Sequence, residues 1–210
     1  MSEGQERMGR PVAVVWDVGR VLYQWNLRFL FAKLIADPDE LEWFVANVVT
    51  EEWHFQSDAG RPLAEMVPEL KALHPRHSDL IDAYVERFVE TLPHAVPGTH
   101  ALVERLGARG VKQFALSNFG AEFWAKLRPQ SRIFDHFADC VISGEERCAK
   151  PHPQIYAVLE RRAGLAGTDL LFIDDRADNI AAARALGWHG HLFTDAAALE
   201  ADLAAHGLIA

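Results

Sequence analysis

The chain has 210 residues, of which 50% are hydrophobic and 24% are charged. This length fits one domain, or one core domain with a smaller insertion, and this composition is ordinary for a globular protein. The formal net charge of −9 and the lack of any lysine- or arginine-rich run argue against a nucleic-acid-binding protein, so an anionic ligand would have to be held by local cations.

The sequence begins with a polar segment. Residues 1–10 lack the apolar region of a signal peptide, and no apolar stretch approaches the roughly 20 residues that a membrane helix needs. The two cysteines, Cys140 and Cys148, fit a reducing compartment better than a disulfide. We therefore expect a cytoplasmic protein without a membrane partner, with residues 1–10 as a disordered leader. Met1 and Met8 both stay candidates for the first residue, and the oligomeric state stays open.

The first regular element is an apolar run over residues 12–16 that ends at Asp17. Its β-branched residues, bounded by Pro11 and Gly19, predict a strand buried on both faces, as in a parallel sheet. The pattern then changes, because no run resembles a strand and four sets of apolar residues recur at helical spacing. These sets start at Leu27, Leu41, Leu63 and Leu80. We therefore predict an inserted cap of four helices over residues 23–92.

Four further apolar runs follow the predicted cap. They occupy residues 111–116, 140–142, 170–173 and 191–193. Helical patterns lie between them, including one that stops at Gly164 and an alanine-rich one that closes at Gly187. Strands that alternate with helices in this way predict an α/β fold with a doubly wound parallel sheet. The predicted core then comprises residues 11–22 and 93–210.

The predicted strands end in polar side chains. Ligands of open α/β sheets bind beyond the carboxyl ends of the strands, so we expect these side chains to converge on one crevice. They are Asp17, Ser117 with Asn118, Asp174 with Asp175, and Lys150 at the start of the helix after the third strand. Three carboxylates do not stay ionised together without a cation between them, and oxygen ligands favour a hard ion such as Mg²⁺, commonly with phosphate. Asp17 is then either a metal ligand or an attacking carboxylate that forms an aspartyl-phosphate.

Four segments resemble, in order and spacing, the four motifs of the haloacid-dehalogenase-like superfamily. They are VVWDVGRVL at residues 14–22, LSN at 116–118, KPHPQIY at 150–156 and FIDDRADNI at 172–180. Each motif alone is weak, but four in order, each at a predicted strand end, are specific. The resemblance covers nearly the whole chain after residue 11. It implies a Rossmann-like core, and the inserted helices resemble the small cap of the subfamily that includes sugar-phosphate phosphatases and the phosphatase domain of soluble epoxide hydrolase.

This resemblance implies a role for each strand-end residue. Asp17 would be the nucleophile, Ser117 and Asn118 would bind the phosphoryl group, and Lys150 would neutralise its charge. The resemblance implies that Mg²⁺ is held by Asp17, the backbone carbonyl of Gly19, Asp174 and Asp175. It also implies that the partner is a small phosphorylated metabolite.

One position departs from the family pattern. Most phosphatases of the family carry a second aspartate two residues after the nucleophile, which protonates the leaving group, but here Gly19 occupies that position. Such an acid is typically worth about 10²–10⁴-fold in rate. The pattern D-x-G-x-V resembles a bacterial branch that includes an α-D-glucose-1-phosphate phosphatase. A sugar 1-phosphate releases a hemiacetal oxygen, which depends less on the missing acid than a simple alkoxide does.

A polar and aromatic patch lies in the middle of the predicted cap. In the family, a cap loop at this place faces the active site and chooses the substrate, so Trp53 and His54 are candidate substrate-binding residues and His54 is a candidate substitute acid. The alternative is that Trp53 and Phe55 form the core of the cap. Whether Asp58 faces the site stays open at this point.

Three functions compete. The leading one is Mg²⁺-dependent hydrolysis of a small phosphate monoester, such as a sugar 1-phosphate. A metal-independent 2-haloacid dehalogenase would share the fold and the nucleophile, but the adjacent Asp174 and Asp175 argue against it. A catalytically weak protein that binds a phosphate ligand or a partner through its cap is the third, and Gly19 is the feature that favours it.

Overall fold

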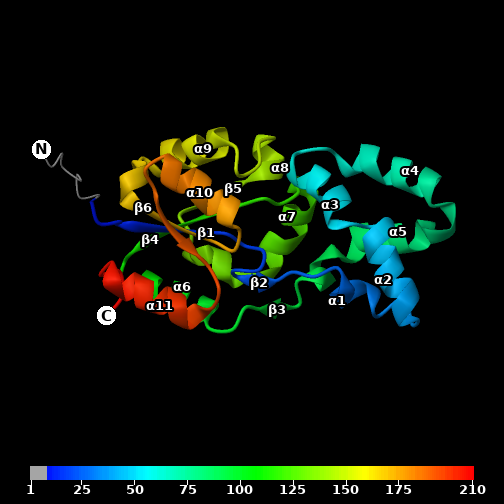
Figure 1. The fold of residues 1–210 in the computed structure, drawn as a ribbon, viewed down its shortest axis with the longest axis horizontal. Helices are drawn as coiled ribbons and strands as arrows, with labels where there is room; N and C mark the ends of the chain where they lie inside the picture. The colour runs from blue at the N-terminus through cyan, green and yellow to red at the C-terminus, as the bar shows by residue number, and fades with distance from the viewer. Residues whose placement is uncertain (1–8) are drawn as a thin grey trace, which may run out of the picture.

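The computed structural model describes residues 9–210 (Figure 1). Its centre is a five-stranded parallel sheet with the strand order β5-β4-β1-β6-β7. The strands are β1 (Ala13–Trp16), β4 (Lys112–Ser117), β5 (Asp139–Ile142), β6 (Leu170–Asp174) and β7 (His189–Leu192). The five predicted strands and the α/β fold class are confirmed. Of the predicted leader, residues 1–8, with both candidate first residues, lie outside the described residues.

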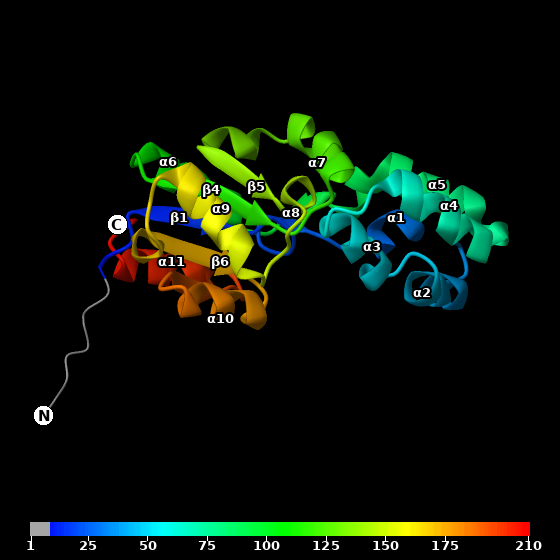
Figure 2. The same cartoon turned by 90° about the horizontal axis from the view of Figure 1, so that it is seen from above.

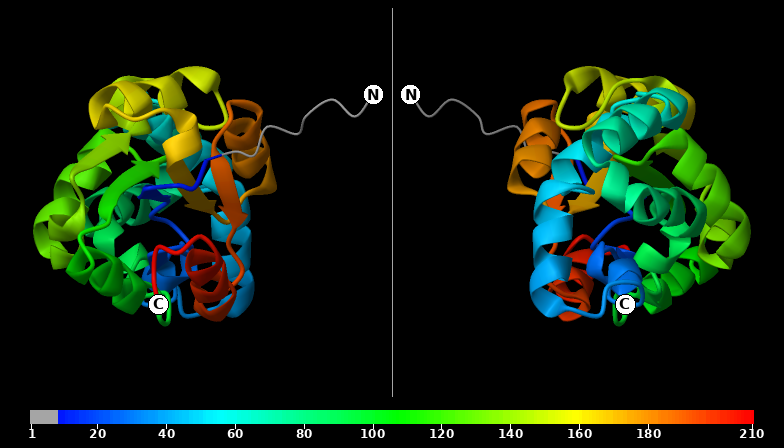
Figure 3. Two further views of the ribbon diagram at one scale, coloured as in Figure 1. Left: turned by 90° about the vertical axis from the view of Figure 1, so that its left-hand side faces the viewer. Right: turned by 90° about the vertical axis from the view of Figure 1, so that its right-hand side faces the viewer.

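Helices cover both faces of the sheet (Figures 2 and 3). Val14 and Trp16 of β1 belong to the same hydrophobic cluster as the buried faces of α6 (Thr99–Ala108) and α11 (Ala196–Ala205). Ala13 and Val15 belong to the opposite cluster with α9 (Pro153–Ala163) and α10 (Ala177–Ala185). Because successive side chains of a strand point to opposite faces and both faces are covered, the central strands β1 and β6 are continuous apolar runs in the sequence.

Most of the segment between β1 and α6 is helical and lies beyond the carboxyl end of the sheet (Figures 1 and 2). Its helices are α1 (Arg28–Phe31), α2 (Pro38–Asn47), α3 (Glu51–Asp58), α4 (Leu63–Leu73) and α5 (Ser78–Arg87), with 3-10 turns η1 (Pro75–His77) and η2 (Phe88–Thr91). A short antiparallel pair, β2 (Tyr23–Gln24) and β3 (His94–Ala95), joins the two connections to the core. The division at residues 23 and 92 stays a prediction.

The predicted count of four inserted helices is wrong, because α3 replaces the loop expected at Trp53 and His54. The hydroxyl of Thr50 accepts a hydrogen bond from the backbone N–H of Trp53 at 2.9 Å, which caps this helix. A search for apolar periodicity misses α3 because its buried residues are polar: His54, Ser57 and Asp58.

The remaining elements complete the layers around the sheet. They are α7 (Ala121–Leu127), η3 (Arg128–Gln130), η4 (Arg132–His136), α8 (Ser143–Glu146) and η5 (Gly167–Asp169). Within residues 9–210, no helix combines the length and the apolar character that crossing a membrane would take.

Candidate active site

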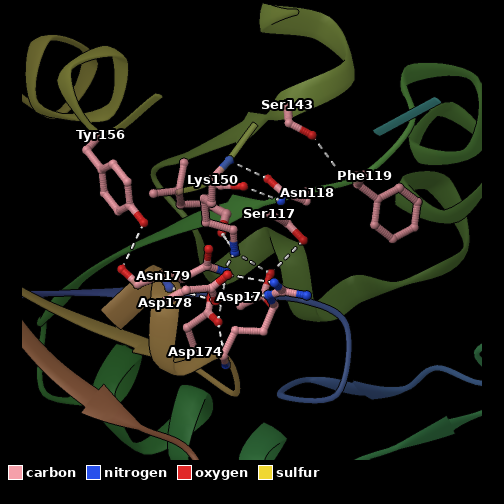
Figure 4. A network of polar contacts seen from close by, with 12 residues as sticks. Asp17, Ser117, Asn118, Phe119, Ser143, Lys150, Tyr156, Asp174, Asp178 and Asn179 are labelled. Atoms are coloured by element: carbon pink, nitrogen blue, oxygen red, sulfur yellow. Dashed lines mark hydrogen bonds and ion pairs between the residues drawn. The ribbon is translucent and has the colours of Figure 1, made fainter. Parts of the chain in front are cut away.

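Three neighbouring strands bring their last residues to the same edge of the sheet. Asp17 follows β1 directly, and its backbone N–H donates to the carbonyl of Ile173 on β6 at 2.9 Å. Ser117 is the last residue of β4, and Asp174 is the last residue of β6. Because β1 lies between β4 and β6 with all three parallel, residues about 100 and 157 positions apart in sequence meet here (Figure 4).

Lys150 is the centre of this cluster. Its ammonium Nζ donates to Asp174 Oδ2 at 2.7 Å and to the carbonyl of Leu116 at 2.8 Å, and it lies 2.9 Å from Asp17 Oδ1. The Ser117 hydroxyl donates to the same Oδ1 of Asp17 at 2.7 Å. Two protein groups therefore contact one oxygen of Asp17, and no described side chain donates a hydrogen bond to the other, Oδ2.

Asn118 holds the backbone of Lys150 in place. Its Nδ2 donates to the carbonyl of Lys150 at 3.0 Å, and its Oδ1 accepts from the N–H of Lys150 at 2.8 Å. This pair of bonds joins the end of β4 to the loop before α9, which positions the Lys150 side chain (Figure 4). The structure thus gives Asn118 a positioning contact in addition to a place in the wall of the cavity described below.

The buried charges shift one another. Burial raises the pKa of Asp17 to about 6; Lys150 opposes this shift, whereas Asp174 and Asp175 add to it. For Lys150, burial alone would lower the pKa, but the carboxylates of Asp17 and Asp174 outweigh burial and hold it above its ordinary value. Lys150 is therefore charged near neutral pH.

The oxygen donors fit a divalent cation. Carboxylate oxygens of Asp17, Asp174 and Asp175 all lie within 4.8 Å of one another. Three carboxylates against one ammonium, that of Lys150, leave two negative charges, which one Mg²⁺ would balance. Gly19, two residues after Asp17, lines the same cavity, and its backbone carbonyl is a further oxygen in this loop.

The two adjacent acids have different environments. Asp174 is fully buried, and its oxygens already accept from Lys150, from Nδ2 of Asn179 and from the N–H of Arg176. Asp175 is half-buried and lines the cavity, and burial together with Asp174 raises its pKa. Asp175 is thus the acid more available to a metal, while Asp174 is chiefly the partner of Lys150.

A cavity of about 320 Å³ opens above this cluster, between the sheet edge and the inserted helices. This volume lies at the lower end of the range for small-molecule sites. The core side of its wall comprises Asp17, Gly19, Arg20, Ser117, Asn118, Phe119, Lys150, Asp175, Arg176 and Asn179, and the other side comprises Trp25, Glu51, Glu52, His54, Phe55, Asp58, Phe88 and Leu92.

Of the two residues predicted to bind substrate from the inserted segment, the structure brings only His54 to the cavity. Trp53 packs against the hydrophobic core, where its ring lies 6.0 Å from that of Tyr84, and it is not part of the cavity wall. His54 is buried, and its Nδ1 lies 2.6 Å from the hydroxyl of Tyr84. Burial lowers the pKa of His54 to about 3, so its imidazole is neutral near pH 7.

Sequence reasoning missed two arginines and a tryptophan in the cavity wall. Arg20 lies over the ring of Trp25 at 5.0 Å and pairs with Glu51 at 2.5 Å. Arg176 follows Asp175 and reaches the wall from the loop before α10. Both arginines lie within the recognised motifs, close to the strand ends, and this position could have predicted that they line the cavity. No sequence pattern predicted the same for Trp25.

Comparisons with known proteins agree with this geometry. Residues 12–187 match the family model described as haloacid dehalogenase-like hydrolase. The chain is 28% identical over 196 residues to a sesquiterpene phosphatase of Aspergillus oryzae, which covers 91% of this chain and 94% of that protein. It is also 29% identical over 109 residues to a phosphoglycolate phosphatase of Yersinia pseudotuberculosis. This match covers 52% of this chain and 47% of that protein, so the chain spans about half the length of this relative.

Solved structures share the fold. A HAD family enzyme of Bacteroides thetaiotaomicron, solved as a magnesium complex, has a TM-score of 0.68 at 19% identity, covering 89% of this chain and 95% of that one. An L-2-haloacid dehalogenase of Xanthobacter autotrophicus has a TM-score of 0.62 at 19% identity, covering 93% and 83%. The resemblance inferred from the four motifs is confirmed, and the chain belongs to the haloacid dehalogenase-like hydrolases.

Proposed function

We propose that the protein hydrolyses a small phosphate monoester with Mg²⁺, through an aspartyl-phosphate formed on Asp17. One observation carries this proposal: Ser117 and Lys150 both contact Oδ1 of Asp17, which leaves Oδ2 as the oxygen that can attack a phosphorus atom in the cavity. An attacking carboxylate held in one orientation beside a fixed ammonium suits phosphoryl transfer, where positioning and charge neutralisation supply most of the rate.

The proposed reaction has two steps. Asp17 Oδ2 attacks the phosphorus, the bond from phosphorus to the ester oxygen breaks, and the alcohol leaves with a proton. Water then attacks the phosphorus of the aspartyl-phosphate, which restores Asp17 and releases phosphate. Lys150 and the Ser117 hydroxyl bind the phosphoryl oxygens in both steps. Mg²⁺, held by Asp17, Asp175 and the Gly19 carbonyl with Asp174 behind them, would neutralise phosphoryl charge.

We infer that residues 23–92 act as the cap that selects the substrate, since eight of the 18 residues in the cavity wall come from this segment. The indole of Trp25 lines this wall, and its Nε1 is buried with no hydrogen-bond partner among the described residues. Glu51 and Glu52 add acceptors for hydroxyl groups. Relatives named as phosphatases support a phosphorylated metabolite as the substrate. A cytoplasmic location is part of the same proposal.

A sugar 1-phosphate is the expected substrate type. Its hemiacetal oxygen leaves more readily than the primary alkoxide of a sugar 6-phosphate, so its hydrolysis depends less on a proton donor, whichever residue supplies the proton. We expect kcat/KM for glucose 1-phosphate to exceed that for glucose 6-phosphate, measured by phosphate release at saturating Mg²⁺. A preference for glucose 6-phosphate would contradict this substrate assignment.

Asp175→Asn is expected to weaken the response to Mg²⁺. Loss of one carboxylate ligand should raise the Mg²⁺ concentration for half-maximal hydrolysis of p-nitrophenyl phosphate by about 10-fold or more. Asp39→Asn, at an exposed position in the first turn of α2, is the matched control and should keep the wild-type Mg²⁺ response. Hydrolysis that persists in excess chelator, or halide release from chloroacetate without metal, would instead favour the dehalogenase alternative.

A further inference from the structure

Because residue 19 is a glycine, it cannot donate a proton to the leaving group in the first step of the proposed reaction. A proton donor could instead lie on the opposite wall of the cavity, which the inserted helices form. Asp58, the last residue of α3, lines this wall. Its side chain is 9% exposed, and its Oδ1 has no hydrogen-bond partner among the described residues. A buried carboxylate oxygen without a hydrogen-bond partner is costly, and a proton on the carboxyl group reduces this cost.

The core holds Asp58 in position. The hydroxyl of Ser143, the first residue of α8, donates to the backbone carbonyl of Asp58 and accepts from the N–H of Phe119 at 3.0 Å. Phe119 comes two residues after Ser117, so the end of α3 is tied to the loop that carries the phosphoryl-binding hydroxyl. The end of α3 therefore keeps its place relative to Asp17.

Two further side chains of the inserted segment form a chain that ends at Asp58. Tyr84 of α5 has its hydroxyl 2.6 Å from Nδ1 of His54, and Nε2 of His54 lies 3.4 Å from Oδ1 of Asp58. Burial raises the pKa of Tyr84, so the phenol stays neutral beside Nδ1 of His54. The imidazole of His54 is neutral as well, so neither side chain places a charge beside Asp58.

Asp58 titrates near neutral pH. Burial raises its pKa to about 7, and the backbone N–H of Gly120 and the charge of Lys150 limit the shift. The titratable groups around it are His54 and Tyr84, and Glu51 lies close enough to both to affect their pKa values. A carboxyl that titrates near the working pH can both give and take a proton.

We propose that Asp58 is the proton donor to the leaving oxygen, and thereby takes the place of the acid absent at Gly19; this rests on the proposed phosphatase function. In the first step the bond from Asp17 Oδ2 to phosphorus forms, the ester bond breaks, and the Asp58 proton passes to the departing oxygen, which leaves as an alcohol. In the second step the Asp58 carboxylate takes a proton from the attacking water, and the phosphoryl group leaves Asp17 as phosphate.

Two esters with different leaving groups test this role. A nitrophenolate leaves without a proton, whereas the alkoxide of glycerol 1-phosphate needs one. Asp58→Asn is expected to lower kcat for glycerol 1-phosphate by about 10²–10⁴-fold and kcat for p-nitrophenyl phosphate by less than about 10-fold. Asp79→Asn, at an exposed position in the first turn of α5, is the control and should leave both values unchanged.

A second variant tests the chemistry by rescue. A Cβ atom at Gly19 would meet nothing nearer than Cβ of Trp25 at 4.0 Å, so the backbone accepts a side chain there. Gly19→Asp in the Asp58→Asn background is expected to recover hydrolysis of glycerol 1-phosphate. A double variant as slow as Asp58→Asn alone would show that no proton donor had been lost, and would overturn the assignment.

The outcomes separate this inference from the function on which it rests. If Asp58→Asn lost equal activity on both esters, the role of Asp58 alone would be overturned. The same holds if the wild-type protein hydrolysed p-nitrophenyl phosphate but failed to hydrolyse glycerol 1-phosphate. A wild-type protein inactive on both esters would overturn both proposals. If Asp58→Asn does not fold, the wild-type pH profile decides: kcat/KM should fall above pH about 7 for glycerol 1-phosphate only, and a fall shared by both esters would overturn the role.

Discussion

Asp17→Asn is expected to abolish hydrolysis of every phosphate ester, with a loss in kcat of about 10⁴- to 10⁶-fold. The amide cannot form the acyl-phosphate bond, so positioning by Lys150 and Ser117 no longer leads to a covalent intermediate. The measurement is kcat for p-nitrophenyl phosphate in saturating Mg²⁺. In the wild type, beryllium fluoride should also form a stable complex at Asp17, and this complex should be absent in the variant.

The same substitution should not harm the fold. The pKa of Asp17 is raised to about 6, so the stability that its protonated form contributes is complete below pH 3.8 and is lost as the pH rises through about 6. Asparagine is neutral and keeps an oxygen for the Ser117 hydroxyl, so at pH 7 without metal we expect an equal or higher melting temperature.

The control for this pair of measurements is Asp195→Asn. Asp195 caps α11 by accepting from the N–H groups of Ala197 and Ala198, and asparagine caps helices equally well. Activity and melting temperature should both stay at wild-type values. An Asp17→Asn protein with more than about one-tenth of wild-type kcat would show that Asp17 is not the nucleophile.

Lys150→Met is expected to be the most destabilising single change at the site. Lys150 is 2% exposed, and methionine would remove the only ammonium that faces the fully buried Asp174 among the described residues. Removing one partner of a buried ion pair typically costs about 3–5 kcal/mol, because the remaining charge is left uncompensated. Urea unfolding at pH 7 without metal would measure the loss, and activity should disappear with it.

Lys33→Met provides the matched control. Lys33 makes a similar contact, 2.7 Å to Glu90, but its side chain is 49% exposed. Exposed ion pairs contribute about 0–1 kcal/mol, so the free energy of unfolding should change little. If the two variants lost equal stability, the burial of the Lys150 cluster would not be the cause. Added Mg²⁺ should recover part of the stability of Lys150→Met, since it supplies positive charge to the same carboxylates.

The inserted segment shows how far sequence patterns reach. The helices that contain Leu41, Leu63 and Leu80 bury apolar faces, and their spacing predicted them. The set that starts at Leu27 yields only the single turn of α1. The sequence pattern did not predict helix α3, because the residues that this helix buries are polar. Two of them, His54 and Asp58, line a cavity instead of a hydrophobic core. Apolar periodicity detects only surfaces that are buried against other apolar surfaces.

The sequence by itself determined the sheet, its strand ends and the cluster that forms there. Buried parallel strands are continuous apolar runs, and parallel neighbours must end at one edge, so Asp17, Ser117 and Asp174 had to meet. Only the tertiary structure decided which acid faces the cavity, Asp175 and not Asp174, and which side of α3 does so, Asp58 and not Trp53. These choices depend on how a helix rotates and packs against its neighbours, which no local pattern specifies.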